Sequence, residues 1–162
     1  PATYFLPTPE KWTTEVFPVP PGFASGLKYK GTEEIRFAPG WSKSDNPQYW
    51  TYMFLWVLNN TDTISADEIN SYLEIYYTGL AEINSKNKES LVKESFKSKS
   101  NIVLAKTESN DLKTYQGSIQ IMDYMRSEPI TLNCKVHVVK CANNSNLFIF
   151  HEVSPNPVTD TV

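Results

Sequence analysis

The sequence predicts a single α+β domain in which a mostly antiparallel sheet of about five to seven strands carries one long helix. Three observations support this fold class: a domain-sized chain of 162 residues, an amphipathic segment over residues 66–85, and several short apolar runs separated by turn residues. Hydrophobic residues make up 40% of the chain and charged residues 20%, which is typical of a globular domain. We therefore expect residues 1–162 to form one domain.

The beginning of the chain is rich in proline. Six of the eleven prolines fall within residues 1–25. Because proline has no backbone N–H to donate, we expect a proline-rich arm here that wraps the domain and forms at most an edge strand. Residues 26–37 then predict a strand or hairpin, which Ala38-Pro39-Gly40 ends.

The run from Tyr49 to Leu58 predicts the centre of the sheet. Its residues are aromatic or aliphatic, with Thr51 as the polar exception. A strand that is apolar on both faces is expected to be covered on both sides, so we place it away from the sheet edges.

The clearest single element is a helix over residues 66–85. Ser65 and Glu68 have the spacing of a capping box, in which each side chain accepts a hydrogen bond from the backbone N–H of the other residue. Apolar residues then recur at steps of three and four, which predicts one buried helical face: Ile69, Tyr72, Leu73, Tyr76, Leu80 and Ile83.

Four further runs predict a strand meander, over residues 102–107, 114–125, 130–141 and 147–153. The order of strands, helix and strand meander is also compatible with an α-β-α sandwich. Two prolines close the pattern, so we expect a disordered tail over residues 155–162.

Charge and hydropathy exclude some classes of partner. The net charge is −3, without the basic surface of most nucleic-acid-binding proteins, so we predict no nucleic-acid partner. The longest apolar run, residues 53–58, is too short to span a membrane. A first residue other than methionine and two glycosylation acceptor patterns, at Asn59 and Asn143, favour a periplasmic or secreted protein, although the compartment stays open.

Cysteine and histidine offer few metal ligands. Cys134 and Cys141 lie in one strand-like run, about 20 Å or more apart, so we predict two free thiols. If the last turn centres on Asn144, His137 and His151 face each other across a hairpin and could share a metal ion. No third ligand is within reach on that face. We therefore predict neither a metal nor another cofactor, with the two histidines as the sole candidates.

Catalytic motifs are missing from the sequence. It has no Gly-x-Ser-x-Gly, no His-Glu-x-x-His, no phosphate loop and no Gly-x-Gly-x-x-Gly. Three acidic residues, Glu33, Glu34 and Asp123, could act as an acid/base pair only if the fold brings them together. An enzyme is thus disfavoured, with a small hydrolase or isomerase as one alternative. A structural subunit of a larger assembly is another.

Aromatic residues are the feature that stands above the background, at 13% of the chain. Trp50, Tyr52 and Trp56 fall on one face of the predicted central strand. This face either belongs entirely to the core or partly lines an apolar pocket that the preceding loop closes with Trp41. The second interpretation makes Trp41, Trp50, Tyr52 and Trp56 the ligand-binding residues. It predicts a non-enzymatic binding or accessory domain for a small apolar ligand or a protein partner.

Overall fold

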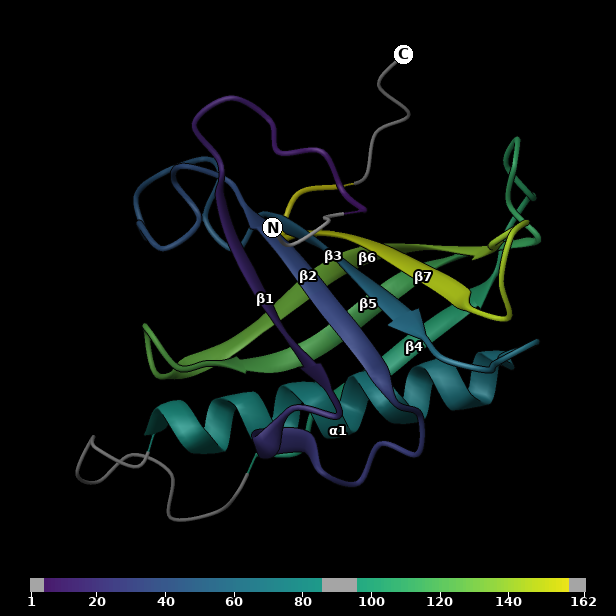
Figure 1. The fold of residues 1–162 in the computed structure, drawn as a ribbon. Coiled ribbons are helices and arrows are strands. Elements are labelled where there is room, and N and C mark those ends of the chain that lie inside the picture. The colour runs from purple at the N-terminus through teal and green to yellow at the C-terminus, as the bar shows by residue number, and fades with distance from the viewer. Residues whose placement is uncertain (1–4, 86–95, 158–162) are drawn as a thin grey trace.

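The computed structural model describes residues 5–85 and 96–157. Within these ranges, seven antiparallel strands form one sheet in the order β1-β2-β3-β7-β6-β5-β4, and one α-helix packs on it (Figure 1). The strands are β1 (Thr13–Val19), β2 (Gly31–Phe37), β3 (Tyr52–Leu58), β4 (Lys99–Leu104), β5 (Lys113–Asp123), β6 (Glu128–Lys140) and β7 (Leu147–Ser154). The helices are the short 3-10 helix η1 (Gly22–Ala24) and the α-helix α1 (Ala66–Ser85).

The predicted α+β class is confirmed, and β3 is an interior strand of the sheet, as its apolar run indicates. It pairs with β2 on one side and β7 on the other. Six of its seven residues are buried. Helix α1 covers one face of the strand, and neighbouring side chains together with the N-terminal segment cover part of the other face. Strand β4 begins three residues earlier than the predicted run, at Lys99 instead of residue 102.

Helix α1 has the predicted bounds and the predicted capping box. The Ser65 N–H donates to the Glu68 carboxylate (2.9 Å), and the Glu68 N–H donates to the Ser65 hydroxyl (3.1 Å). The apolar face is buried from Ile69 to Tyr77 and partly buried at Leu80, whereas Ile83 in the last turn is 50% exposed.

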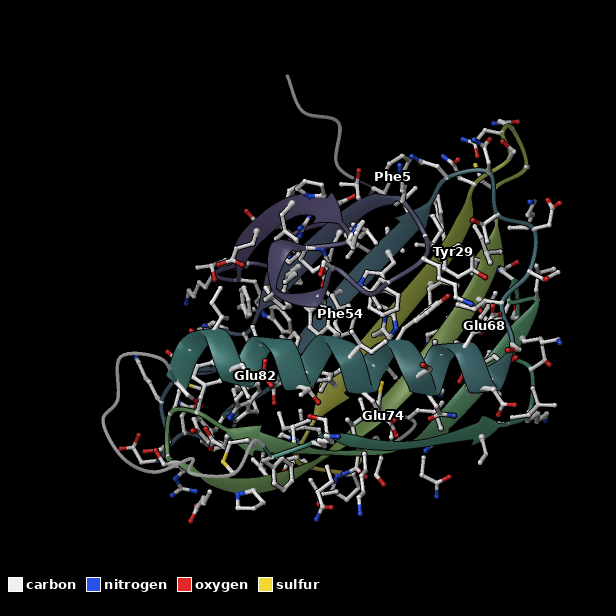
Figure 2. The ribbon with its side chains drawn as sticks, turned by 90° about the horizontal axis from the view of Figure 1, so that it is seen from below. Phe5, Tyr29, Phe54, Glu68, Glu74 and Glu82 are labelled. Atoms are coloured by element: carbon white, nitrogen blue, oxygen red, sulfur yellow. The ribbon has the colours of Figure 1, made fainter. Side chains whose placement is uncertain are left out.

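Helix α1 defines the inner face of the sheet, and the opposite face is the outer face. Figure 2, seen from the helix side, shows Phe54 of β3 close to α1. The described residues place no helix on the outer face, so they form two layers and not the three of an α-β-α sandwich. Instead, the backbone N–H groups of Phe5 and Leu6 donate to Glu34 on that face.

Helix α1 approaches η1 closely at Gly79. A Cβ atom at this position would overlap the carbonyl oxygen of Phe23. Phe23 also packs edge-on against Tyr76, with ring centroids 5.2 Å apart. Glycine at residue 79 therefore lets the segment between β1 and β2 pack directly on the helix.

The remaining sequence predictions divide between confirmed and untested. Both cysteines are free, as predicted, and Cys134 is buried. None of the helices in the described part of the chain has the length and apolar character that crossing a membrane requires. Of the expected tail, residues 155–157 follow β7 and residues 158–162 lie outside the described residues.

Candidate functional site

A cavity of about 220 Å³ lies between the inner face of β1, β2 and β3 and the second half of α1. We call it the aromatic pocket, because eight of its twelve described lining residues carry aromatic rings: Phe17, Phe23, Phe37, Trp41, Trp50, Tyr52, Tyr76 and Tyr124. The other four are Glu15, Ile35, Leu80 and Asn84. The pocket thus joins residues that are distant in the sequence.

Three of the four predicted ligand-binding residues line this pocket. Trp41, Trp50 and Tyr52 are among its walls, and Trp41 comes from the loop that precedes β3, as the pocket hypothesis requires. Trp56 does not line it. It lies further along β3, in the core, where its ring packs edge-on against His151 (4.6 Å between centroids).

The loop between β2 and β3 carries Trp41 and is held by short hydrogen bonds. The Trp50 N–H donates to the Trp41 carbonyl (2.8 Å), and the Gly40 N–H donates to the Gln48 side chain (3.0 Å). The Trp41 ring rests against Phe37 (4.5 Å between centroids) and stands nearly perpendicular to Trp50 (85°). The loop therefore fixes Trp41 as one wall of the pocket.

Trp50 has an unusual backbone for a large side chain. Its φ is +56°, in the left-handed region, and its side chain is almost completely buried. For a residue this bulky such a conformation costs on the order of 1–3 kcal/mol, and strain of this kind concentrates at functional sites. The strained residue is a wall of the pocket.

Two carboxylates lie near the pocket on neighbouring strands. Glu15 of β1 lines it and is exposed, whereas Glu33 of β2 is completely buried behind Tyr76. The register pairs Glu15 with Ile35 and Phe17 with Glu33, so all four side chains share the inner face. Because residues 15 and 17 are two apart on a strand, the sequence indicates that their side chains share one face. That this is the inner face follows only from the pairing of β1 with β2.

The carboxyl group of Glu33 favours its protonated form. Burial raises its pKa to about 8, and the hydrogen bond from the Tyr76 hydroxyl (2.8 Å) opposes this shift only in part. The Trp56 indole N–H also favours the charged form, although it does not reach hydrogen-bond geometry with the second oxygen, Oε2. A neutral carboxyl group therefore stands behind the pocket wall at pH 7.

The three acidic residues named as possible catalysts do not converge. Glu34 points to the outer face, where it pairs with Arg36 (2.9 Å). Asp123 accepts hydrogen bonds from the Tyr49 hydroxyl (2.7 Å) and from the backbone of the turn that follows it. Glu33 lies beside the aromatic pocket and Glu34 does not, because successive residues of a strand face opposite sides.

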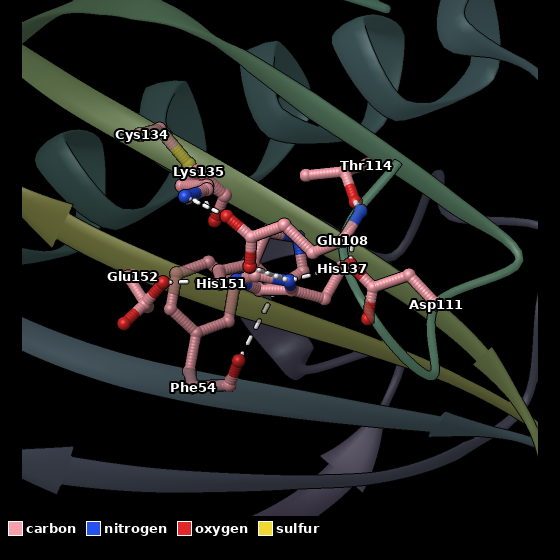
Figure 3. A network of polar contacts seen from close by, with 9 residues as sticks. All are labelled: Phe54, Glu108, Asp111, Thr114, Cys134, Lys135, His137, His151 and Glu152. Atoms are coloured by element: carbon pink, nitrogen blue, oxygen red, sulfur yellow. Dashed lines mark hydrogen bonds and ion pairs between the residues drawn. The ribbon is translucent and has the colours of Figure 1, made fainter. Parts of the chain in front are cut away.

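A polar network occupies the outer face around His137 (Figure 3). His137 Nδ1 donates to Asp111 (2.7 Å) and Nε2 donates to Glu152 (2.9 Å). Burial lowers the pKa of His137, but the two carboxylates outweigh it and leave the pKa above its ordinary value. The Glu108 carboxylate pairs with Lys135 beside this imidazole.

The predicted pairing of the two histidines is wrong by one residue. His137 lies opposite Phe150, and His151 lies opposite Val136. The turn over residues 141–146 centres between Asn143 and Asn144, and a one-residue shift of register moves a side chain to the other face. The two histidines therefore lie on opposite faces and cannot share a metal ion.

One set of described residues has the spacing of metal ligands: Glu108, Asp111 and His137, whose ligand atoms lie within 4.8 Å of one another. Glu152 would orient the imidazole from its other nitrogen, as carboxylates do beside metal-bound histidines. A cation there would have to displace Lys135 from Glu108 and the proton from Nδ1.

His151 occupies the contrasting environment of the inner face. Burial lowers its pKa to about 3, although its Nδ1–H donates to the Phe54 carbonyl (3.3 Å; Figure 3). The imidazole stacks on the Phe54 ring, with centroids 4.0 Å apart. It is a neutral member of the core.

Comparison of the chain with family models, with curated proteins and with solved structures found no match.

Proposed function

We propose that this chain is a non-enzymatic binding domain whose aromatic pocket takes a compact ligand with a mainly apolar body. One observation carries the proposal: a 220 Å³ cavity in which eight of twelve lining residues are aromatic, closed on one side by the Trp41 loop. Pockets for drug-sized ligands are typically about 300–1,000 Å³. An apolar cavity of about 150 Å³ holds benzene, so this pocket suits a single ring or a short branched chain.

The energetics of the site support a role beyond stability. The fold retains a buried carboxyl group, Glu33, and a strained backbone at Trp50, and both lower the stability of the domain. Groups that oppose folding yet converge on one cavity are characteristic of functional sites, where stability is exchanged for binding.

A thermal-shift screen with small aromatic and branched aliphatic compounds tests the proposal. A ligand at a hundred times its dissociation constant is expected to raise the melting temperature by roughly 5–10 °C. Trp41→Ala should abolish that shift and change the stability of the unliganded protein little, because Trp41 lies on a loop and is only partly buried. Trp12→Ala is the matched control, since Trp12 is also partly buried but lies outside the lining. A large loss of stability without any effect on binding would contradict the proposal.

A small isomerase or hydrolase is a second candidate, which the protonated Glu33 favours. A group with a pKa of about 8 suits proton transfer near neutral pH, and the Tyr76 hydroxyl connects it to the pocket wall. Under this function, Glu33→Gln should abolish turnover of a bound compound without abolishing its binding. Unchanged turnover in that variant would exclude Glu33 as the acid or base.

A further inference from the structure

We propose that the ligand of the aromatic pocket is a compact organic cation, an alkylated ammonium group on a short apolar body. This inference rests on the proposed function and adds the chemical class of the ligand. It follows from three sources of negative potential that meet at one cavity: ring faces, the Glu15 carboxylate and the end of a helix.

The aromatic walls are the first source. The face of an aromatic ring carries negative charge density, and cations bind within about 6 Å of the ring centroid, most strongly over tryptophan. Two tryptophans, Trp41 and Trp50, meet nearly at right angles (85°, 6.2 Å between centroids) at this cavity. Rings that meet at such angles form the corner of a cage and not a flat slot, and cages of this kind recognise quaternary ammonium groups.

The carboxylate of Glu15 is the second source. Glu15 lines the pocket with an exposed side chain, and it is the one charged residue among the described lining residues. Glu33, behind Tyr76, is protonated at pH 7 and adds no negative charge. An anionic ligand would meet repulsion from Glu15, whereas a cation gains from it at a site partly shielded from water.

The end of α1 is the third source. Leu80 and Asn84, in the last two turns of the helix, line the pocket, and α1 ends at Ser85. The last turn of a helix carries about half a negative charge on its free carbonyl groups, which favours a nearby cation. Within the described residues, the last turn of α1 contains no basic side chain, and Lys86 follows it directly in the sequence.

Choline and its neutral isostere, 3,3-dimethylbutan-1-ol, provide the test. The two molecules share one shape and differ by a charged nitrogen in place of a carbon. We expect choline to bind roughly tenfold more tightly in isothermal titration calorimetry. The aromatic rings and the carboxylate attract its positive charge, which the isostere lacks. Phenol serves as a neutral aromatic probe of the same pocket.

The variant Glu15→Gln separates the contribution of the carboxylate to choline binding from the contribution of the aromatic rings. This substitution of an exposed residue should weaken choline binding several-fold and leave binding of the isostere unchanged. Glu82→Gln makes the same change of charge near the same end of α1 but outside the lining, and it should leave choline binding close to the wild-type value.

The outcomes decide the two proposals separately. Preference for choline that depends on Glu15 supports both. Equal binding of choline and the isostere, or binding of phenol alone, overturns the cationic ligand but keeps an apolar binding pocket, provided that Trp41→Ala removes the binding. If choline, the isostere and phenol all fail to bind at millimolar concentration, the cationic ligand and the compact apolar ligand are both rejected.

Discussion

Glu33 and Glu34 are consecutive residues of one strand, and the two faces of the sheet treat them in opposite ways. Glu33 is buried on the inner face, where Tyr76 is its hydrogen-bond donor and its pKa rises to about 8. Glu34 is equally buried on the outer face, where Arg36 and two backbone N–H groups surround it. The inner face thus keeps its acid neutral, and the outer face pairs its acid with a cation.

The two histidines repeat this contrast on neighbouring strands. His151 is neutral on the inner face down to about pH 3, whereas His137 on the outer face has a raised pKa between Asp111 and Glu152. The outer face uses charge to attach the N-terminal segment and the loop over residues 105–112 to the sheet. The inner face instead keeps Glu33 and His151 neutral and forms the pocket.

Replacement of Arg36 is expected to lower the free energy of unfolding more than any of the other substitutions below. Arg36→Met leaves Glu34 buried without its cation, which should lower the free energy of unfolding by about 3–5 kcal/mol. The control is the double variant Glu34→Leu/Arg36→Met, which removes both charges and should lose much less. Urea unfolding at pH 7 measures both. A single variant as stable as the wild type would show that the outer pair does not act as described.

Glu33→Gln should change stability in the opposite direction. The folded protein holds the Glu33 proton up to about pH 8, whereas the unfolded chain loses it near the ordinary value of 4.5. Between these values the folded state binds more protons, so the free energy of unfolding of the wild type falls as pH rises. The Gln side chain does not titrate, so the variant lacks this pH-dependent loss of stability. It should be more stable than the wild type by about 2–4 kcal/mol at pH 7.5 and nearly equal to it at pH 4.5.

Denaturant curves at those two pH values provide the measurement. Glu34→Gln is the matched control, since it makes the same substitution one residue later and should destabilise the protein at pH 7.5. A Glu33→Gln variant that is less stable than the wild type at both values would refute the protonated state.

His137→Gln has the smallest expected effect and the clearest pH signature. A raised pKa means that the ion pairs of His137 stabilise the fold fully below its unfolded value of about 6.5, and that this stabilisation disappears as pH rises through the folded pKa. The variant should lose about 1 kcal/mol at pH 5.5 and little at pH 9. NMR titration of the two imidazoles checks the premise: His137 should titrate above 6.5 and His151 should stay neutral to about pH 3.

Much of the fold could be predicted from the sequence, because the helix and the buried strand each follow from a pattern of neighbouring residues. The capping box at Ser65 and the apolar period behind it determine α1, and the uninterrupted apolar run determines that β3 is covered on both sides. These patterns report which side chains must be buried. They do not report which distant segment covers them.

The candidate site was predictable only as far as one strand and its preceding loop. Trp41, Trp50 and Tyr52 share that stretch and do line the pocket. Glu15 joins them only through the pairing of β1 with β2, and Trp56 is excluded only because the pocket ends before it. The histidine pairing failed for a related reason, since its outcome depends on whether a turn has an odd or an even number of residues.

The close contact at Gly79 affects which ligands can fit the pocket. Any larger residue at this position would meet the Phe23 carbonyl, so the helix and η1 are in direct backbone contact here. Phe23 on one side and Leu80 on the other belong to the pocket lining, which makes this part of the wall rigid. The other wall, the segment over residues 38–50, is held by hydrogen bonds within the loop, so both walls are fixed and a ligand has to fit the cavity in the shape that these contacts give it.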